Sequence, residues 1–242
     1  MEEFKLPTEI IDLPSKGLLY PEDSELAKGV LEMKYMTAKE EDILTNQSYI
    51  RNGTVLDRLM KSLIVSKINY DDLLIGDKNA IMVAARILGY GSEYVFDYGG
   101  EEQTVNLSSI ENKPLKEELF AARTNEFTFT LPKSKNVISF KLLNHKDEQD
   151  ISRELEGLKK INKDADPSLS TRLKYMIISV EGKRDKKDIR EYVDNYLLAQ
   201  DSRALREYIR EIQPDVDLTF FPDGNENRIS LPIGLKFFWP DL

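Results

Sequence analysis

The sequence predicts a mixed α+β protein, and three observations lead to this class. Apolar residues recur at helical spacing in residues 37–91 and again in residues 145–214. In residues 92–144 and 215–242 they alternate with polar residues instead, as in half-buried β-strands. Turn-forming residues such as Gly99-Gly100 separate the alternating segments, which indicates antiparallel hairpins.

An extended arm and a first strand are expected in residues 1–36. Pro7, Pro14 and Pro21 interrupt any regular element there, so the arm needs contacts with other elements to be ordered. Residues 29–36 alternate as a half-buried strand does. The arm can pack on the chain's own helices or in a groove of a partner, and self-packing is slightly favoured.

The region 37–91 is predicted to form three helices. Thr37 begins the first helix, and Glu40 three residues later completes a capping box. The consecutive carboxylates of Glu40, Glu41 and Asp42 could suggest a metal or acid–base site. Their position in the first turn, where the helix dipole favours anions, explains them better.

Two hairpins and one short helix are expected in residues 92–144, and a third hairpin in residues 215–242 around a turn at 222–225. An isolated hairpin is marginal in water. We therefore expect the three hairpins to share one sheet or a small barrel, with the C-terminal hairpin rejoining the β region.

Residues 145–214 carry four apolar stripes at helical spacing and are predicted to form a helical bundle. The joints fall at Asp166-Pro167, Gly182 and Asp201-Ser202. Because these joints are short, consecutive helices should be antiparallel neighbours.

The composition excludes several classes of active site. There is no cysteine, so disulfides, thiolate zinc sites and a cysteine nucleophile are excluded. His145 is the single histidine, which excludes metal sites with two imidazoles, and its neighbours have the pattern of a helix cap. We therefore expect no enzyme, no catalytic or metal-binding residue and no cofactor. No long apolar run or signal-peptide pattern occurs, so a membrane span or a secretory signal is not expected either.

The net charge of −9 is unevenly distributed along the chain. Residues 1–60 carry 7 basic and 12 acidic side chains, whereas residues 151–214 carry 14 basic and 12 acidic ones. The acidic balance opposes nucleic-acid binding. One basic cluster could contact a phosphate or an acidic partner, although a solvated turn explains it more simply; it consists of Lys183, Arg184, Lys186 and Lys187.

Four segments carry a resemblance to a known family. They are residues 13–21 (Leu-Pro-Ser-Lys-Gly-Leu-Leu-Tyr-Pro) followed by Gly29, residues 36–44, Gly76-Asp77 leading into residues 85–91, and residues 231–234 with 237–240. In these segments the chain resembles the baseplate protein family of T-even-type contractile-tailed bacteriophages. Some relatives carry cysteine pairs in the hairpins, and this chain has none.

The resemblance implies a structural or assembly protein of the baseplate's central hub, either a hub subunit or a hub assembly chaperone. Its partners would be other baseplate or tail hub proteins, and it would be found in the host cytoplasm during assembly or in the tail baseplate of the virion. Whether it forms a homo-oligomer stays open.

The residues expected to contact partners are apolar and lie near the two ends of the chain. Apolar and aromatic side chains dominate protein interfaces, but the same residues could belong to the protein's own core. Strand alternation would send Phe237 and Trp239 to one face and Phe238 to the other. The expected contacts are Leu18, Leu19, Tyr20, Phe237, Phe238 and Trp239.

Two alternatives of other classes stay open. One is a nucleic-acid-binding adaptor that uses the basic cluster. The other is a carboxylate-dependent cell-wall hydrolase, because 43 acidic residues make some close carboxylate pair unavoidable.

Overall fold

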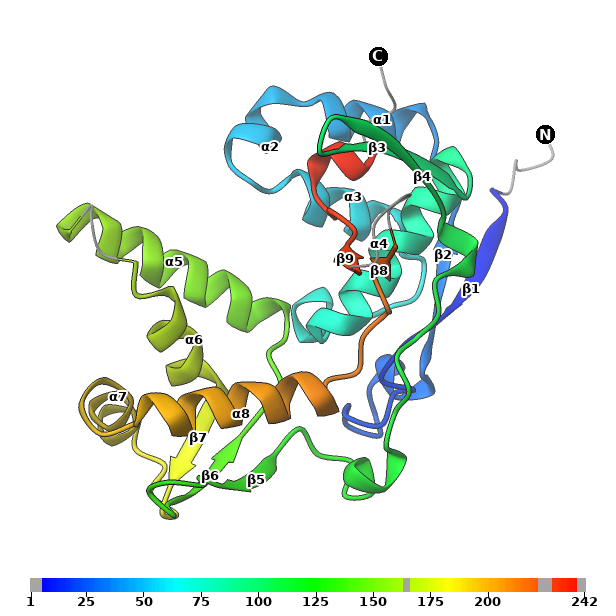
Figure 1. Ribbon diagram of the computed structural model, residues 1–242. Helices are drawn as coiled ribbons and strands as arrows, with labels where there is room; N and C mark the ends of the chain where they lie inside the picture. The colour runs from blue at the N-terminus through cyan, green and yellow to red at the C-terminus, as the bar shows by residue number, and fades with distance from the viewer. Residues whose placement is uncertain (1–5, 163–165, 222–227, 239–242) are drawn as a thin grey trace. The chain divides into compact units, whose positions relative to one another are not determined.

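The computed structural model describes residues 6–162, 166–221 and 228–238 (Figure 1). The described residues form eight α-helices and four small antiparallel sheets, so the predicted α+β class is confirmed. None of these sheets closes into a barrel. The chain divides into two compact units. Unit 1 comprises Met1–Ile68, Gly76–Leu115 and Pro214–Leu242, and unit 2 comprises Asn69–Ile75 and Lys116–Gln213.

Unit 1 begins with a two-stranded antiparallel sheet and continues through helices to a hairpin (Figure 1). Its first elements are β1 (Thr8–Asp12), η1 (Glu25–Lys28), β2 (Val30–Lys34), α1 (Ala38–Thr45), α2 (Gln47–Arg51) and α3 (Val55–Leu63). They are followed by α4 (Ile75–Tyr90), β3 (Glu93–Tyr98), β4 (Glu101–Asn106) and η3 (Leu107–Ser109). The predicted strand after the arm is therefore present, but residues 37–91 contain four α-helices and not three, because the first predicted helix is interrupted at Asn46 between α1 and α2. Helix α3 buries Leu59, Met60 and Leu63 along one face, as its apolar spacing requires.

The last segment of the chain returns to unit 1, but not through a shared sheet. Its elements are β8 (Thr219–Phe220), β9 (Ile229–Ser230) and η5 (Leu235–Phe238). Strands β8 and β9 pair only with each other, and the β3–β4 hairpin forms its own sheet. The ring of Tyr94 meets that of Phe237 edge-on at 4.8 Å, and Phe96 meets Phe220 at 5.2 Å. The hairpins therefore meet through aromatic side chains, and the expectation of one common sheet is wrong. The predicted turn at 222–225 lies outside the described residues.

Unit 2 contains a three-stranded antiparallel sheet in the order β5-β6-β7, packed against helices. Its elements are η2 (Tyr70–Asp72), η4 (Glu117–Phe120), β5 (Phe127–Thr130), β6 (Val137–Phe140), α5 (His145–Ile161), α6 (Ser168–Met176), β7 (Ile177–Val180), α7 (Lys186–Asn195) and α8 (Ala199–Ile212). Helix α8 lies along the sheet (Figure 1), where Tyr208 stacks on Phe129 at 4.9 Å and meets Phe140 edge-on at 6.0 Å.

Two expectations for unit 2 need correction. The helical pattern predicted for 145–214 continues through residues 177–180, but these residues form β7, which pairs with β6. Residues 145–214 are therefore not a pure helical bundle. The joint expected at Asp201-Ser202 lies inside the first turns of α8, where both residues are buried. The carboxylate of Asp201 accepts the backbone N–H groups of Lys133 at 2.7 Å and Ser134 at 3.0 Å, so it ties the β5–β6 turn to the helix.

Candidate binding surfaces

The predicted contact residues of the arm lie mostly inside unit 1. Leu19 and Tyr20 are buried, and Leu18 is half-buried. Leu13 is also buried, so the arm packs on its own unit, as was slightly favoured from the sequence. Leu19 and Tyr20 consequently offer little surface to a partner, which corrects their assignment as contacts. Deletion of residues 1–21 would remove core side chains.

A buried carboxylate anchors the arm to α4. Asp77 accepts hydrogen bonds from the Ser15 backbone N–H (2.9 Å), the Ser15 hydroxyl (2.7 Å) and the Tyr20 hydroxyl (2.6 Å). Burial raises the pKa of Asp77 above its ordinary value, although the three donors oppose this effect. Serine, tyrosine and aspartate side chains are a set that catalysis can use, but all three are buried here. The arrangement is therefore a structural anchor.

Two glycines allow the backbone of the arm to turn and pack closely beside this anchor. Gly17 and Gly29 have φ of 74° and 72°, the left-handed region that favours glycine. A Cβ atom on Gly17 would lie 2.4 Å from the carbonyl oxygen of Ala27, and one on Gly29 would lie 2.7 Å from the carbonyl carbon of Lys16. The motif around Ser15 that carries the resemblance thus forms a turn in which Gly17 and Gly29 allow two backbone segments to pack closely.

Glu40 has the capping role that the sequence predicts, together with two further partners. Its carboxylate accepts the Thr37 backbone N–H at 3.0 Å, the Ser62 hydroxyl at 2.7 Å and the Lys34 ammonium at 2.8 Å. Burial acts to raise the pKa of Glu40, but these donors outweigh it and lower the pKa to about 2. The group is a hydrogen-bonded and ion-paired anion inside unit 1.

The aromatic residues near the end of the chain are also buried where they are described. Phe237 and Phe238 are 1% and 0% exposed. They lie in the 3-10 helix η5 and not in a strand, so the predicted alternation between two faces is wrong. Both are core residues, which corrects their assignment as partner contacts. Trp239 lies outside the described residues.

The free edge of β1 is an exposed surface of unit 1. Two hydrogen bonds at the ends of the β1–β2 ladder show which residues of β1 point toward β2. Leu13 N–H donates to Gly29 O (2.8 Å), and Tyr35 N–H donates to Pro7 O (3.3 Å). Because hydrogen-bonded pairs alternate in an antiparallel sheet, the N–H and C=O groups of Thr8, Ile10 and Asp12 point away from β2. Among the described residues the β1–β2 sheet has only these two strands, so this edge is open there.

The side chains along this edge combine an apolar residue with acidic ones. Ile10 is 63% exposed and lies opposite Glu32 on β2. Glu9 and Asp12 on β1 are exposed. Charged side chains protect open edges from pairing with one another, while a suitable extended segment can still add as a further strand. The edge is therefore suited to an extended partner segment that is not itself acidic.

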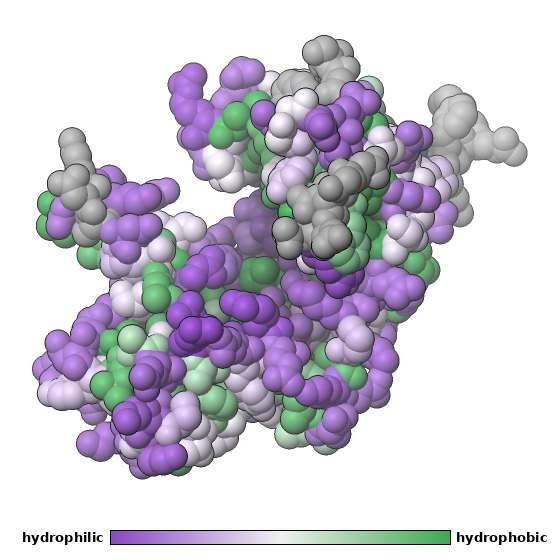
Figure 2. Space-filling view, viewed as in Figure 1, coloured by the Kyte–Doolittle hydropathy of each residue, from purple (hydrophilic) through white to green (hydrophobic). Residues whose placement is uncertain are grey.

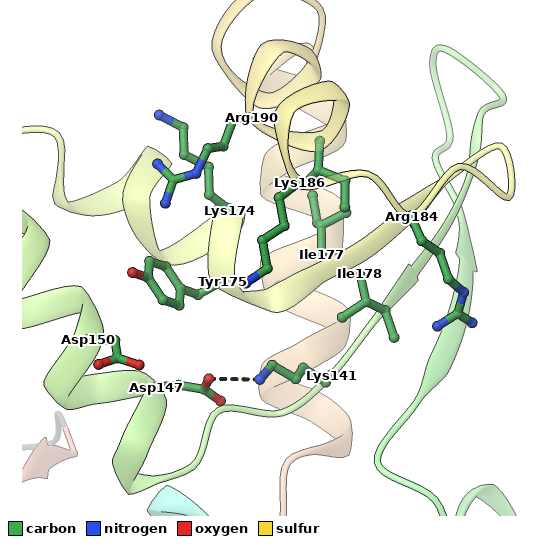
Figure 3. A pocket seen from close by; sticks show the side chains of 11 residues that line it. Lys141, Asp147, Asp150, Lys174, Tyr175, Ile177, Ile178, Arg184, Lys186 and Arg190 are labelled. Carbon is green, nitrogen blue, oxygen red and sulfur yellow. Dashed lines mark hydrogen bonds and ion pairs between the residues drawn. The ribbon is translucent and has the colours of Figure 1, made fainter.

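A cleft of about 300 Å³ lies in unit 2, between α5, α6, β7 and α7 (Figure 3). Its apolar lining consists of Ile177, Ile178 and Ile189, and Tyr175 adds an aromatic ring. Its charged lining consists of Lys141, Asp147, Asp150, Lys174, Arg184, Lys186 and Arg190. Two members of the predicted basic cluster, Arg184 and Lys186, thus belong to a formed cleft.

Four of the five cations in this lining already have carboxylate partners. The ammonium of Lys141 lies 2.7 Å from Asp147, and that of Lys174 lies 2.7 Å from Asp194. Arg190 makes two hydrogen bonds of 2.7 Å with Glu154, and Arg184 pairs with Glu126. The guanidinium of Arg190 lowers the pKa of Glu154, and the Glu154 carboxylate raises the pKa of Arg190. These four cations therefore help to hold the walls of the cleft together.

The sequence identified only part of this cleft. The dense run of charge indicates the basic cluster, but helical spacing predicts a helix at residues 177–180 and so does not place the isoleucines of β7 beside that run. The β-branched residues of 177–180, followed by Gly182, are the signal that could have indicated a strand and a turn there. Lys183 and Lys187 are exposed and do not line the cleft.

His145 has a structural position at the start of α5. It is 2% exposed, its ring meets that of Tyr70 at 4.7 Å, and its Nε2 lies 2.9 Å from the side-chain nitrogen of Gln149. The preceding Asn144 and Asp147 form the capping box that the neighbouring sequence predicted. In the described part of the chain, no three His, Asp or Glu side chains are grouped so that they could hold a metal ion.

Neither unit contains, in its described residues, a helix with the length and apolarity needed to cross a membrane. On the face seen in Figure 2, hydrophilic residues predominate and the apolar residues form separate small patches.

Comparison of the chain with protein-family models, with curated proteins and with solved structures gives no match. The two surfaces and the sequence resemblance are therefore the basis from which a function can be inferred.

Proposed function

We propose that this chain is a structural or assembly protein of a phage baseplate hub and that it acts through protein–protein contacts. The proposal starts from the sequence resemblance to the baseplate protein family of T-even-type phages. In this role the chain would be a hub subunit or a hub assembly chaperone, found in the host cytoplasm or in the tail baseplate.

The positions of the resemblance motifs support this proposal. Ser15 and Asp77 come from two separate segments of the resemblance and are joined by hydrogen bonds inside unit 1. Glu40 comes from a third segment and is buried with its own set of donors. These three residues of the resemblance segments therefore stabilise the fold. This is expected of a family whose members share a fold and contact partners through their surfaces.

The observation that carries the proposal is the open edge of β1. The outward N–H and C=O groups of Thr8, Ile10 and Asp12 provide main-chain partners for a further strand. The exposed Ile10 provides an apolar contact beside them. An assembly protein needs such a surface, whereas a hydrolase needs a pair of accessible carboxylates.

The two alternatives receive less support. Nucleic-acid binding through the basic cluster is weakened because Arg184 is paired with Glu126 and because the net charge is −9. A carboxylate-dependent hydrolase is weakened because the two carboxylates that line the cleft are paired, Asp147 with Lys141 and Asp150 with Arg153.

Co-purification tests the proposal directly. The tagged chain is expressed together with baseplate hub proteins, and the captured proteins are identified by mass spectrometry. We expect the wild-type chain to retain at least one hub protein and Ile10→Pro to retain at least tenfold less. Proline at this position removes an N–H that points to the open edge, not to β2.

Ile161→Glu is the matched control, because Ile161 is 85% exposed on α5 of unit 2. It should retain the same hub proteins as the wild type, and the circular dichroism of both variants should equal that of the wild type. A wild-type chain that captures no hub protein contradicts the proposed function. Equal capture by the wild type and Ile10→Pro shows instead that the β1 edge is not the contact.

A further inference from the structure

Lys186 presents a positive charge that the walls of the cleft do not neutralise. It is the first residue of α7, is exposed, and reaches toward the middle of the cleft (Figure 3). Among the residues that the structure describes, no carboxylate pairs with its ammonium, in contrast to the other four cations of the lining. A ligand with a negative charge can therefore bind there without displacing an existing ion pair.

Charged and apolar side chains together surround this ammonium. Ile178 and the ring of Tyr175 are half-buried in the lining, whereas Ile177 and Ile189 are buried. Lys186, Ile189 and Arg190 occupy one face of α7, because residues three and four apart are neighbours on a helix. An anionic group at Lys186 would thus have the partly exposed Ile178 and Tyr175 side chains nearby, on which an aliphatic side chain can pack.

The size and charge of the cleft limit what can occupy it. A volume of about 300 Å³ lies at the lower end of ligand sites and is suited to a group of one or two residues. One unpaired cation matches one negative charge. These features favour a single carboxylate with an aliphatic neighbour over a phosphate chain.

We propose that the cleft of unit 2 binds a segment of a partner protein in which a carboxylate is next to an aliphatic side chain. The carboxylate pairs with Lys186 and the aliphatic side chain packs on Ile178 and the ring of Tyr175. This site is separate from the β1 edge and does not depend on the proposed function, since it follows from the cleft alone.

Titrations of small probes into the ¹⁵N-labelled full chain, followed by NMR, test this site. N-acetyl-leucine supplies a main-chain carboxylate, and acetyl-Glu-Leu-amide supplies a side-chain carboxylate. N-acetyl-leucine amide keeps the aliphatic group without the charge, and inorganic phosphate keeps charge without the aliphatic group. We expect saturable shifts of amide signals in β7 and the first turn of α7 with at least one of the two carboxylates. The uncharged amide and phosphate should bind at least tenfold more weakly.

Lys186→Ala should weaken binding of the carboxylate probe at least tenfold. Lys187→Ala makes the same charge change at the neighbouring position, outside the lining, and should alter binding less than twofold. Both residues are exposed, so neither variant should disturb the fold. Four results each overturn the proposal: no saturable shift with either carboxylate, equal binding of the uncharged amide, equal or tighter binding of phosphate, and equal losses in the two variants.

Discussion

The two units each contain a fully buried aspartate that ties distant segments together, yet the pKa values of the two carboxylates are shifted in opposite directions. Asp77 of unit 1 holds the arm, and Asp201 of unit 2 holds the β5–β6 turn. Burial raises the pKa of Asp77 above its ordinary value. For Asp201, burial acts in the same direction, but the hydrogen-bonding groups of Lys133 and Ser134 outweigh it and lower the pKa.

The difference comes from depth. Neither side chain is accessible to solvent, but Asp77 is surrounded by much more protein than Asp201. Both carboxylates have donors that favour the ionised form, so the larger cost of burial at Asp77 decides the direction of its shift. Donors stabilise the ionised form of a carboxylate near the surface, and its pKa falls. In a deeply buried carboxylate, the loss of hydration destabilises the ionised form more strongly, and its pKa rises.

The largest expected effect is that of Asp77→Ala. The substitution leaves the Ser15 N–H and the hydroxyls of Ser15 and Tyr20 without their acceptor in a buried place, which should cost about 4 kcal/mol of the free energy of unfolding. Urea denaturation measures the loss, and hydrogen exchange should increase in β1 and β2. A loss no larger than that of Asp201→Ala would contradict the importance of depth.

Asp201→Ala should have a smaller effect, about 2 kcal/mol, because two backbone N–H groups lose their acceptor near the surface, where water can replace it. Hydrogen exchange should increase in the turn between β5 and β6 and stay unchanged in β1. An increase of hydrogen exchange in unit 1 would contradict the expectation that each carboxylate stabilises only its own unit.

Tyr20→Phe removes one of the three donors to Asp77 and keeps the ring. We expect a loss of about 1 kcal/mol in urea denaturation, since Asp77 retains both donors of Ser15. The pKa of Asp77 should rise further, because a donor that favours the ionised carboxylate is lost. If this variant is as stable as the wild type, the Tyr20 hydroxyl does not contribute to the anchor.

The smallest expected effect is a difference in pH dependence. The folded-state pKa of Asp201 is lowered, so its contribution to stability is present above the unfolded-state pKa and is lost as the pH falls through the folded-state value. The stability advantage of the wild type over Asp201→Asn should therefore grow as the pH rises through the range of ordinary carboxyl groups.

For Asp77 the sign is opposite. Its folded-state pKa is raised, so the folded chain holds the proton after the unfolded chain has released it, and stability falls as the pH rises between the two values. The advantage of the wild type over Asp77→Asn should therefore shrink over the same range. Denaturation curves at several pH values check both variants, and slopes of equal sign would contradict the comparison.

Local signals in the sequence predicted the ends of helices well. The capping partners Thr37 with Glu40, and Asn144 with Asp147, are three residues apart, so their chemistry is visible in a short window. The anchor of Ser15 on Asp77 joins residues 62 positions apart, and nothing in either segment alone indicates the pairing. Arm packing could be favoured from composition, but its partner could not be named.

Strand β7 and the C-terminal aromatics were assigned incorrectly because local patterns were ambiguous there. Met176, Ile177 and Val180 fit a helical stripe, and only pairing with β6 makes residues 177–180 a strand. Phe237 and Phe238 are adjacent, which suggests opposite faces in a strand, but the 3-10 helix η5 lets both reach the core. Large apolar residues suit a core as well as an interface, so the sequence could not separate the two roles.

The division of the chain also affects its synthesis on the ribosome. Apart from a short stretch at residues 69–75, unit 2 is one uninterrupted segment, whereas unit 1 needs residues from 214 onward. The rings of Phe237 and Phe238 that complete its core are translated after all of unit 2. We therefore expect unit 2 to acquire its native structure on the nascent chain first. Unit 1 can complete its fold only after its C-terminal segment has been translated.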